Sequence, residues 1–193
     1  MSLAQLPHLT PRAAAATKTH AFEEVYAENV DFVWRTLCRL GVPPAAVEDA
    51  AQDVFVVVHR KLAEFEGRSS IRTWLFQLTR NVVHDHRRTT RRRNARLGHD
   101  EEEILRARAA DDHAPDVCAA RAEAVRILHE LLDKLDDDKR EVFILADLEQ
   151  LPAAQVAEAL GVNVNTIYSR LRLAREAFNR ELARHEAREG RQP

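Results

Sequence analysis

Apolar residues recur at intervals of three and four along most of this chain, a spacing that predicts amphipathic α-helices. The pattern covers six segments, three in each half of the chain: 22–40, 44–65, 71–82, 116–135, 138–149 and 156–182. No segment alternates apolar and polar residues in the way that a half-buried strand does. The pattern therefore predicts an all-α protein.

Residues that end and begin helices stand between these segments. Gly41 ends the first helix, and Pro44 suits the start of the second because proline is tolerated at a first helical position. Ser69 or Ser70 is placed to cap the third helix by accepting a hydrogen bond from a backbone N–H. The first half is therefore expected to contain three helices with defined boundaries.

Residues 151–175 have the spacing of a helix-turn-helix, whose second helix can lie in the DNA major groove. Gly161 suits a left-handed turn residue, and Asn163 can cap the second helix. The apolar positions of that helix point inward, which leaves an exposed set that can reach base edges and phosphates: Asn165, Thr166, Tyr168, Ser169, Arg170, Arg172 and Arg175. The alternative is an ordinary helical hairpin within a bundle.

The helix that begins near residue 71 becomes strongly basic towards its end. Seven arginines and one acidic residue lie between Thr79 and Leu97. Polar and basic side chains lie on one face of this helix, opposite the apolar stripe, with two further side chains next to that face. The full set is Thr73, Trp74, Gln77, Arg80, Asn81, His84 and Arg87. Such a face suits a nucleic-acid backbone and unstacked bases. The alternative is a solvated helix end whose positive charge favours the helix dipole.

The sign of the charge changes directly after this basic helix. Residues 100–116 hold seven acidic residues and two arginines, a segregation that predicts a flexible linker. We therefore expect two small helical domains joined by that linker, with a disordered lead-in and a frayed tail: 1–19 lead-in, 20–97 first domain, 98–115 linker, 116–186 second domain and 187–193 tail.

Acidic and amide side chains gather on the polar side of the second helix: Glu48, Asp49, Gln52 and Asp53. Two readings remain open. Acidic residues in a first turn stabilise the helix dipole. A cluster of this kind can also form a docking face for a basic partner surface.

Composition and motifs exclude several classes of function. The net charge of −2 excludes a uniformly basic coat for nucleic acid. The chain has no Gly-rich phosphate loop, GxSxG or HExxH motif, so no residue is a candidate for catalysis. His84 and His86 lie two apart on a helix and cannot share a face, and the two cysteines have no metal-ligand spacing, so neither a metal nor a cofactor is expected.

The same sequence has no signal-peptide pattern at its start, and no apolar run approaches the roughly 20 residues that a membrane span needs. We therefore expect a cytoplasmic protein without membrane insertion.

Three segments together resemble bacterial RNA polymerase sigma factors of the sigma-70 superfamily, specifically the compact extracytoplasmic-function (ECF) class. They are Glu48–Phe55 with Leu62 and Phe65 after it, the run Phe65–Arg88, and the helix-turn-helix. The resemblance covers 22–97 and 123–184. It implies that the two helical domains are sigma region 2 and sigma region 4.

The resemblance also implies roles for each segment. It assigns recognition and melting of the −10 promoter element to the loop before the third helix and to that helix: Arg68, Ser69, Arg72, Thr73, Trp74, Gln77, Arg80, Asn81, His84, Arg87 and Arg88. It assigns docking on the β′ clamp helices of polymerase to the second helix: Glu48, Asp49, Gln52, Asp53 and Phe55.

In the same family the helix-turn-helix reads the −35 element, so the resemblance gives that role to the exposed set listed above. Two positions depart from the family pattern, Leu173 where arginine is frequent and Gln155 where glutamate is usual. The implied partners are core RNA polymerase (β′ clamp helices and β flap), promoter DNA and an anti-sigma factor, which can hold the protein near the membrane. The implied protein is not itself an enzyme.

Two other functions fit parts of the sequence. A conventional helix-turn-helix regulator binds duplex operators as a dimer, but it needs neither the acidic second helix nor the basic third helix. An adaptor with sigma-like surfaces binds a regulator without directing transcription. Promoter-specific transcription with core polymerase distinguishes both from a sigma factor.

Overall fold

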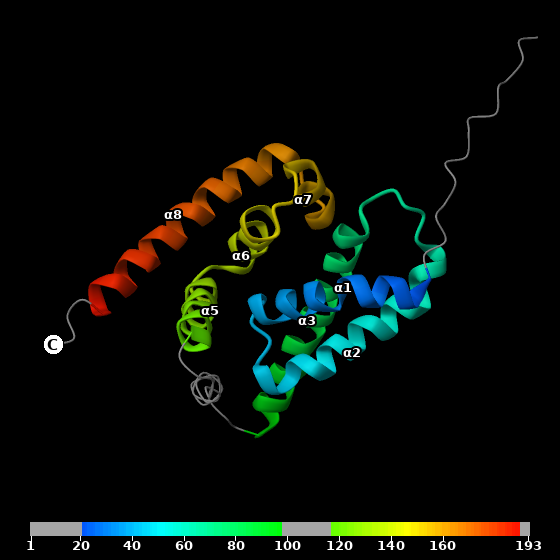
Figure 1. Cartoon of the computed structure of the whole chain (residues 1–193), viewed down its shortest axis with the longest axis horizontal. Helices are drawn as coiled ribbons and strands as arrows, with labels where there is room; N and C mark the ends of the chain where they lie inside the picture. Colours follow the sequence, from blue (N-terminus) through cyan, green and yellow to red (C-terminus); the bar gives the residue numbers. More distant parts are fainter. Residues whose placement is uncertain (1–20, 98–116, 190–193) are drawn as a thin grey trace, which may run out of the picture.

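The computed structural model describes the backbone of residues 21–97 and 117–189, and the side chains of residues 21–90 and 123–188. Within these residues the chain is helical and has no strand, so the all-α prediction is confirmed (Figure 1). The first half contains α1 (Phe22–Arg39), α2 (Pro44–Lys61), the 3-10 helix η1 (Leu62–Glu64) and α3 (Ile71–Leu97). The second half contains α5 (Val117–Asp133), α6 (Asp137–Phe143), η2 (Ile144–Leu148), α7 (Ala153–Leu160) and α8 (Val164–Glu189).

Some expected parts fall outside the described residues. The lead-in of residues 1–19 and the linker of residues 98–115 both lie there. The expected tail begins at residue 187, and α8 continues as far as Glu189.

In the first half, α1, α2 and α3 pack together around a core of fully buried side chains that includes Val33, Val54 and Leu75. Gly41 ends α1 with a φ of 84°, in the left-handed region where glycine is favoured. Pro44 lies in the first turn of α2, as the sequence predicts. The backbone N–H of Thr73 donates to Ser70 Oγ at 3.1 Å, which identifies Ser70 as the serine that caps α3.

In the second half, α6 packs against α8, and α7 lies between α3 and α8. Asp136 caps α6 by accepting a hydrogen bond from the backbone N–H of Lys139 at 2.9 Å. The helix predicted over 138–149 is divided in the structure, because α6 passes into a π-helical turn at Ile144–Leu148. Wider i→i+5 turns of this kind are rare, and the apolar pattern gives no sign of them.

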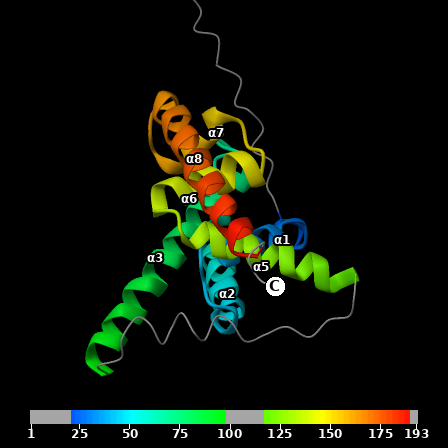
Figure 2. The same ribbon diagram turned by 90° about the vertical axis from the view of Figure 1, so that its left-hand side faces the viewer.

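The two halves contact each other directly. Their buried apolar side chains form one continuous cluster. Helix α3 packs against α1, α2 and α7. Phe76 and Val83 are buried although they lie outside the apolar stripe that the sequence predicts for this helix, which consists of Ile71, Trp74, Leu75, Leu78 and Val82. Arg39 of α1 also pairs with the nearly buried carboxylate of Glu149, which follows η2. The end of α3 extends beyond the other helices (Figure 2).

Candidate nucleic-acid and partner-binding surfaces

The turn between α7 and α8 has the geometry that the sequence predicts. Gly161 has φ 67° and ψ 32°, the left-handed conformation, and its N–H closes the end of α7. Asn163 Oδ1 accepts a hydrogen bond from the N–H of Asn165 at 2.8 Å and so caps α8. The two helices are therefore held as a helix-turn-helix by local interactions.

The first half of α8 buries one side and exposes the other. Ile167 and Ala174 are fully buried. Opposite them, Asn165, Ser169 and Arg172 are exposed at positions i, i+4 and i+7, the spacing of residues that line one helical face. We call these three residues the outward face of α8.

The other predicted members of the set lie around this face. Tyr168 is 60% exposed beside it. Leu173, which does not belong to the predicted set, is exposed as well. Thr166 is half-buried on one flank. Arg170 lies on a flank and Arg175 on the opposite flank, about 140° apart by helical geometry.

Each arginine of this surface has a carboxylate partner. Arg172 donates to Glu176 of the same helix at 2.6 Å, Arg170 to Asp138 of α6 at 2.9 Å, and Arg175 to Asp147 of η2 at 2.6 Å. Exposed ion pairs contribute little to stability, about 0–1 kcal/mol. Each guanidinium group can therefore leave its carboxylate at a small cost in free energy and bind a phosphate instead. Sequence reasoning missed Asp138 and Asp147, because the pairing depends on the path of α6 and η2.

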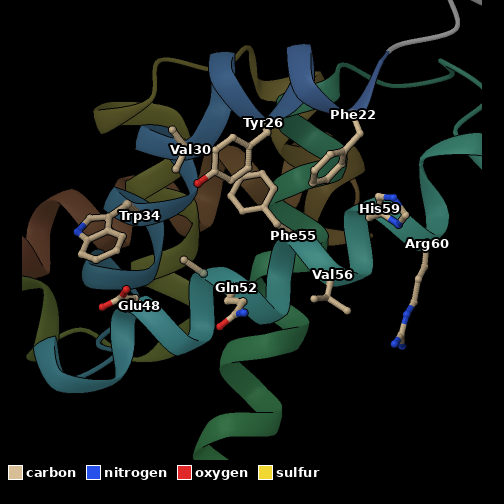
Figure 3. A pocket seen from close by; sticks show the side chains of 11 residues that line it. Phe22, Tyr26, Val30, Trp34, Glu48, Gln52, Phe55, Val56, His59 and Arg60 are labelled. Carbon is tan, nitrogen blue, oxygen red and sulfur yellow. The ribbon is translucent and has the colours of Figure 1, made fainter.

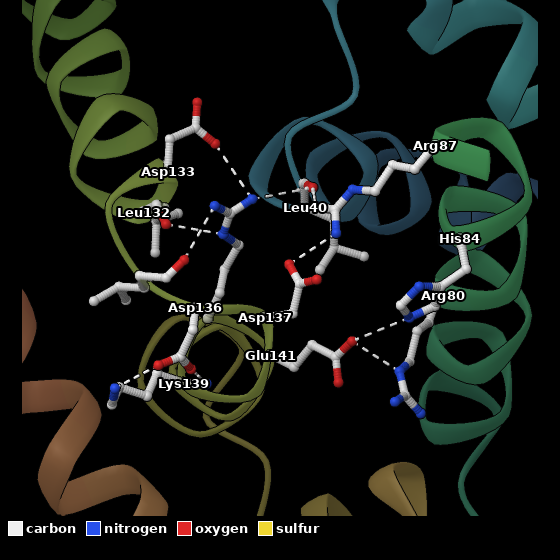
Figure 4. Close-up of polar contacts among 12 residues, drawn as sticks. Leu40, Arg80, His84, Arg87, Leu132, Asp133, Asp136, Asp137, Lys139 and Glu141 are labelled. Carbon is white, nitrogen blue, oxygen red and sulfur yellow. Dashed lines mark hydrogen bonds and ion pairs between the residues drawn. The ribbon is translucent and has the colours of Figure 1, made fainter. Parts of the chain in front are cut away.

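The basic face of α3 is partly covered by α6 in this structure. Arg80 Nε donates to Glu141 Oε1 at 2.8 Å, and His84 Nε2 lies 3.7 Å from the same oxygen. Arg87 Nη1 donates to Asp137 Oδ1 at 2.8 Å (Figure 4). We call these five residues the α3–α6 contact.

The two acids of the α3–α6 contact have opposite pKa directions. Burial raises the pKa of Glu141, and the charge and hydrogen bond of Arg80 only partly oppose it. Burial also acts to raise the pKa of Asp137, but the hydrogen bond and charge of Arg87 outweigh it and lower that pKa. The net shift therefore favours the charged form of Asp137 and opposes that of Glu141.

Thr73 contradicts the expected position of the α3 face. Its side chain is fully buried, and its hydroxyl bonds with Ser70 Oγ at 2.8 Å, so it is not exposed for DNA. Gln77 is half-buried and donates from Nε2 to the backbone carbonyl of Glu158 in α7 at 3.1 Å. The sequence pattern could not show that α7 covers this side of α3.

The loop before α3 and its first turn are more accessible. Trp74 packs against Phe65 with ring centroids 5.0 Å apart, and the guanidinium of Arg72 lies 5.8 Å from the ring centre of Phe32. Arg68 is exposed and pairs with Glu66. The remaining predicted positions are Ser69, which is half-buried, and Asn81 and Arg88, which are exposed.

The polar side of α2 is exposed as predicted at Glu48, Asp49, Gln52 and Asp53. Phe55 differs, because only 6% of it is exposed and its ring packs against Tyr26 at a centroid distance of 4.6 Å. It therefore supports this surface from beneath.

A groove of about 730 Å³ runs between α1 and α2 beside these polar residues (Figure 3). Three large apolar side chains in its wall, Tyr26, Trp34 and Val56, are each more than 40% exposed. We call it the α1–α2 groove. Trp34 was missed from the sequence, although it continues the four-residue steps from Phe22 through Tyr26 and Val30.

The described residues contain no group of three or more metal-ligating side chains. In the same part of the chain no helix is both long and apolar enough to cross a membrane.

Comparison with known proteins matches both halves. The family described as "Sigma-70 region 2" matches residues 25–93, and "Sigma-70, region 4" matches residues 126–178. The RNA polymerase sigma factor CnrH of Cupriavidus metallidurans is 30% identical over 166 residues, which cover 84% of this chain and 86% of CnrH. The chain belongs to the ECF class of sigma-70 RNA polymerase sigma factors.

Further relatives agree with this membership. The probable RNA polymerase sigma factor RfaY of Xanthomonas campestris pv. campestris is 31% identical over 180 residues, although the match covers 93% of this chain and only 44% of RfaY. A solved structure of CnrH with the cytosolic domain of CnrY has a TM-score of 0.62 and 25% identity, over 88% of this chain and 92% of that one. The sigma factor RpoE of Bartonella quintana, solved with the anti-sigma factor NepR, shares the fold with a TM-score of 0.66 and 22% identity, over 84% and 96% of the two chains.

As a sigma factor, the protein binds core RNA polymerase and directs it to promoters for the initiation of transcription. Helices α1–α3 form region 2, and α5–α8 form region 4. The presence of both regions in order does not favour a conventional helix-turn-helix regulator or a protein-interaction adaptor, since neither requires region 2.

Proposed function

We propose that region 4 of this sigma factor reads the −35 element through the outward face of α8 and its flanks. The observation that carries the proposal is the exposure of Asn165, Ser169 and Arg172 on the side of α8 away from the core. Amide, hydroxyl and guanidinium groups are those that bond base edges and phosphates. The flanking side chains in the proposed site are Thr166, Tyr168, Arg170 and Arg175.

Region 2 supplies the −10 contacts in this proposal. The loop before α3 and the basic side of α3 bind and open the −10 element, because arginines attract phosphates and an aromatic ring can stack on an unpaired base. The proposed residues are Arg68, Ser69, Arg72, Trp74, Gln77, Arg80, Asn81, His84, Arg87 and Arg88. Buried Thr73 is left out and acts as part of the α3 cap.

The polar side of α2 and the α1–α2 groove form the proposed docking site for core polymerase. The acidic groups Glu48, Asp49 and Asp53 attract a basic surface, and the exposed apolar groups of the groove supply buried area. The β flap of polymerase is the proposed contact of region 4. We also propose that an anti-sigma factor binds this chain, since its relative CnrH has been solved with the cytosolic domain of CnrY.

We further propose that the chain performs no catalysis of its own and acts in the cytoplasm, including when an anti-sigma factor holds it near the membrane. Polymerase supplies the chemistry, and this chain supplies the recognition.

Transcription from fragmented genomic DNA, with core polymerase and with or without this protein, tests the proposal. We expect new transcripts with shared upstream elements. The double variant R172A/R175A should lose those transcripts while it still binds core polymerase. R180A/R184A is the matched control, because both arginines are exposed on the same helix and pair with Glu181. Unchanged promoter use by R172A/R175A contradicts the −35 assignment.

The docking site has its own test. Replacing Asp49 and Asp53 with asparagine should weaken the affinity for core polymerase, because both charges are exposed and directed away from the core of region 2. The variant E23Q/E24Q removes the same charge from the first turn of α1 and is the control. Equal affinity of both double variants and the wild type for polymerase rejects the α2 docking site.

A further inference from the structure

Leu173 is an exposed aliphatic side chain on the side of α8 to which we assign the −35 element. It is 41% exposed, whereas Leu171 is half-buried and Ala174 is fully buried on the same helix. Single exposed leucines are common on soluble proteins, so exposure alone assigns no role to this one. Its neighbours on the helix decide what it can contact.

Two further side chains lie in line with Leu173 along α8. Thr166 stands seven residues before it, about 20° away around the helix axis, and Ser169 stands four residues before it on the same side. The Ser169 hydroxyl donates to the backbone carbonyls of Asn165 at 3.2 Å and of Thr166 at 3.0 Å, so its hydrogen is used within the helix. We call Thr166, Ser169 and Leu173 the α8 strip. It offers DNA an aliphatic side chain and a threonine methyl group.

Arginines border the α8 strip on both sides. Arg170 lies about 60° from Leu173 around the helix axis, and Arg172 lies about 100° away on the other side. Their guanidinium groups pair with Asp138 and Glu176 in exposed ion pairs, which cost little to break. Arginines that bind DNA on both sides would hold the strip against the floor of the major groove, where Leu173 leaves water.

The major groove presents one apolar group that matches such a strip. Thymine carries a C5-methyl group there, whereas the edges of adenine, guanine and cytosine present hydrogen-bond donors and acceptors that a leucine cannot satisfy. The strip spans seven residues, about 10.5 Å along the helix, and base pairs rise by about 3.4 Å. It can therefore reach about three neighbouring base pairs.

We propose that Leu173 is a specificity-determining residue that reads the C5-methyl group of a thymine in the −35 element. Thr166 and Ser169 extend the same contact towards the start of α8, and the arginines on either side hold the helix in the groove. The inference rests on the −35 role proposed above for α8. It adds the identity of a base that this chain selects.

The test compares thymine with uracil, which lacks only the methyl group and keeps every hydrogen-bonding group of the base. Holoenzyme containing the full chain is titrated with a promoter fragment recovered from the genomic transcription experiment. The thymines of its −35 element are replaced by uracil one at a time, on either strand. We expect about fourfold weaker binding at one or two positions, the equivalent of about 0.8 kcal/mol for one buried methyl-sized group.

The variant L173A assigns that methyl contact to its residue. It should bind the thymine fragment several-fold more weakly than the wild type, and uracil at the sensitive position should cost it nothing further, because two changes in one contact are not additive. V125A is the matched control, because Val125 is 45% exposed but lies on α5. It should keep the full preference for thymine over uracil.

Three results overturn the proposal: a −35 element without thymine on either strand, equal binding of thymine and uracil at every position, or an L173A variant that keeps the wild-type preference. L173A that loses affinity for core polymerase and keeps the preference identifies Leu173 as a polymerase contact instead.

The variant R172A/R175A separates this proposal from the one beneath it. Loss of promoter use by that variant, together with equal binding of thymine and uracil by the wild type, overturns the methyl contact and leaves the −35 role of α8 in place. Unchanged promoter use by R172A/R175A rejects the −35 role itself.

Discussion

At the scale of single residues, the recognition surface depends on which way each arginine of α8 points. The sequence identifies most of the exposed set because Ile167, Leu171 and Ala174 define the inward side by their spacing. It could not rank the arginines, since Asp138 and Asp147 come from elements whose path is set by tertiary packing. Arg172 has the most exposed head group of the three, and Arg170 the least.

This difference predicts an order of effects. R172A should weaken binding of holoenzyme to a promoter by about 5- to 150-fold, the range for losing one good base or phosphate contact of about 1–3 kcal/mol. R170A should cost less, because Arg170 lies on a flank and already faces Asp138. Electrophoretic mobility shift at fixed salt measures both. A larger loss for R170A than for R172A would show that the helix meets DNA by its other flank.

Trp34 supplies a second prediction at this scale. W34A should weaken core polymerase binding by at least about tenfold, since exposed tryptophans are frequent binding hot spots, while thermal stability changes little at a side chain that is 42% exposed. V125A is the control, because Val125 is similarly exposed but lies on α5 of region 4. Titration of labelled polymerase measures the affinity. Loss of stability without loss of affinity would falsify a docking role for Trp34.

At the scale of elements, local signals predicted the caps and turns well. Gly161, Asn163 and Ser70 act through bonds within a few residues, so the sequence contains all the information needed. The π-helical turn at Ile144–Leu148 was not predicted. Over a single turn, an α-helix with i→i+4 bonds and a π-helix with i→i+5 bonds have nearly the same pattern of apolar and polar positions. That turn carries Asp147, the partner of Arg175.

The turn before α8 gives a prediction for stability. A methyl group at Gly161 would meet no atom within 4 Å, so the cost of G161A comes only from its φ of 67°. We expect a loss of about 1–2 kcal/mol in the free energy of unfolding, the cost of left-handed backbone for an ordinary residue. G161N should lose less, because asparagine tolerates this conformation. Urea unfolding gives both values, and equal losses would show that backbone strain is not the cause.

At the scale of the whole molecule, the two regions form a closed structure instead of separate units. The sequence predicted both regions and their order, because each motif is contiguous. It could not predict the contact between them, because Arg80 and Glu141 lie 61 residues apart and no periodic pattern connects them. Phe76 and Val83 are buried outside the predicted stripe because α3 packs against α1 and α2 as well as α7.

Closure predicts the order in which arginines of the free wild-type chain react with phenylglyoxal. Arg172 should react fastest, Arg80 and Arg87 more slowly, and Arg140 slowest, in line with exposed fractions of 66%, 32%, 30% and 8% for their side chains. Peptide mass spectrometry after timed quenching measures the rates. Arg80 reacting as fast as Arg172 would mean that the regions are apart in solution.

The Leu40 carbonyl at the end of α1, which accepts hydrogen bonds from Arg87 and Arg140, has a consequence for how the contact between the two regions can change. A backbone oxygen is present whatever side chain stands at position 40, and it has two lone pairs, enough for Arg87 and Arg140 together. Substitution can therefore alter only the donors, one at a time, and each loss leaves the other bond in place. Mutations can therefore weaken the contact between region 2 and region 4 in small steps, because the backbone acceptor is present in every variant.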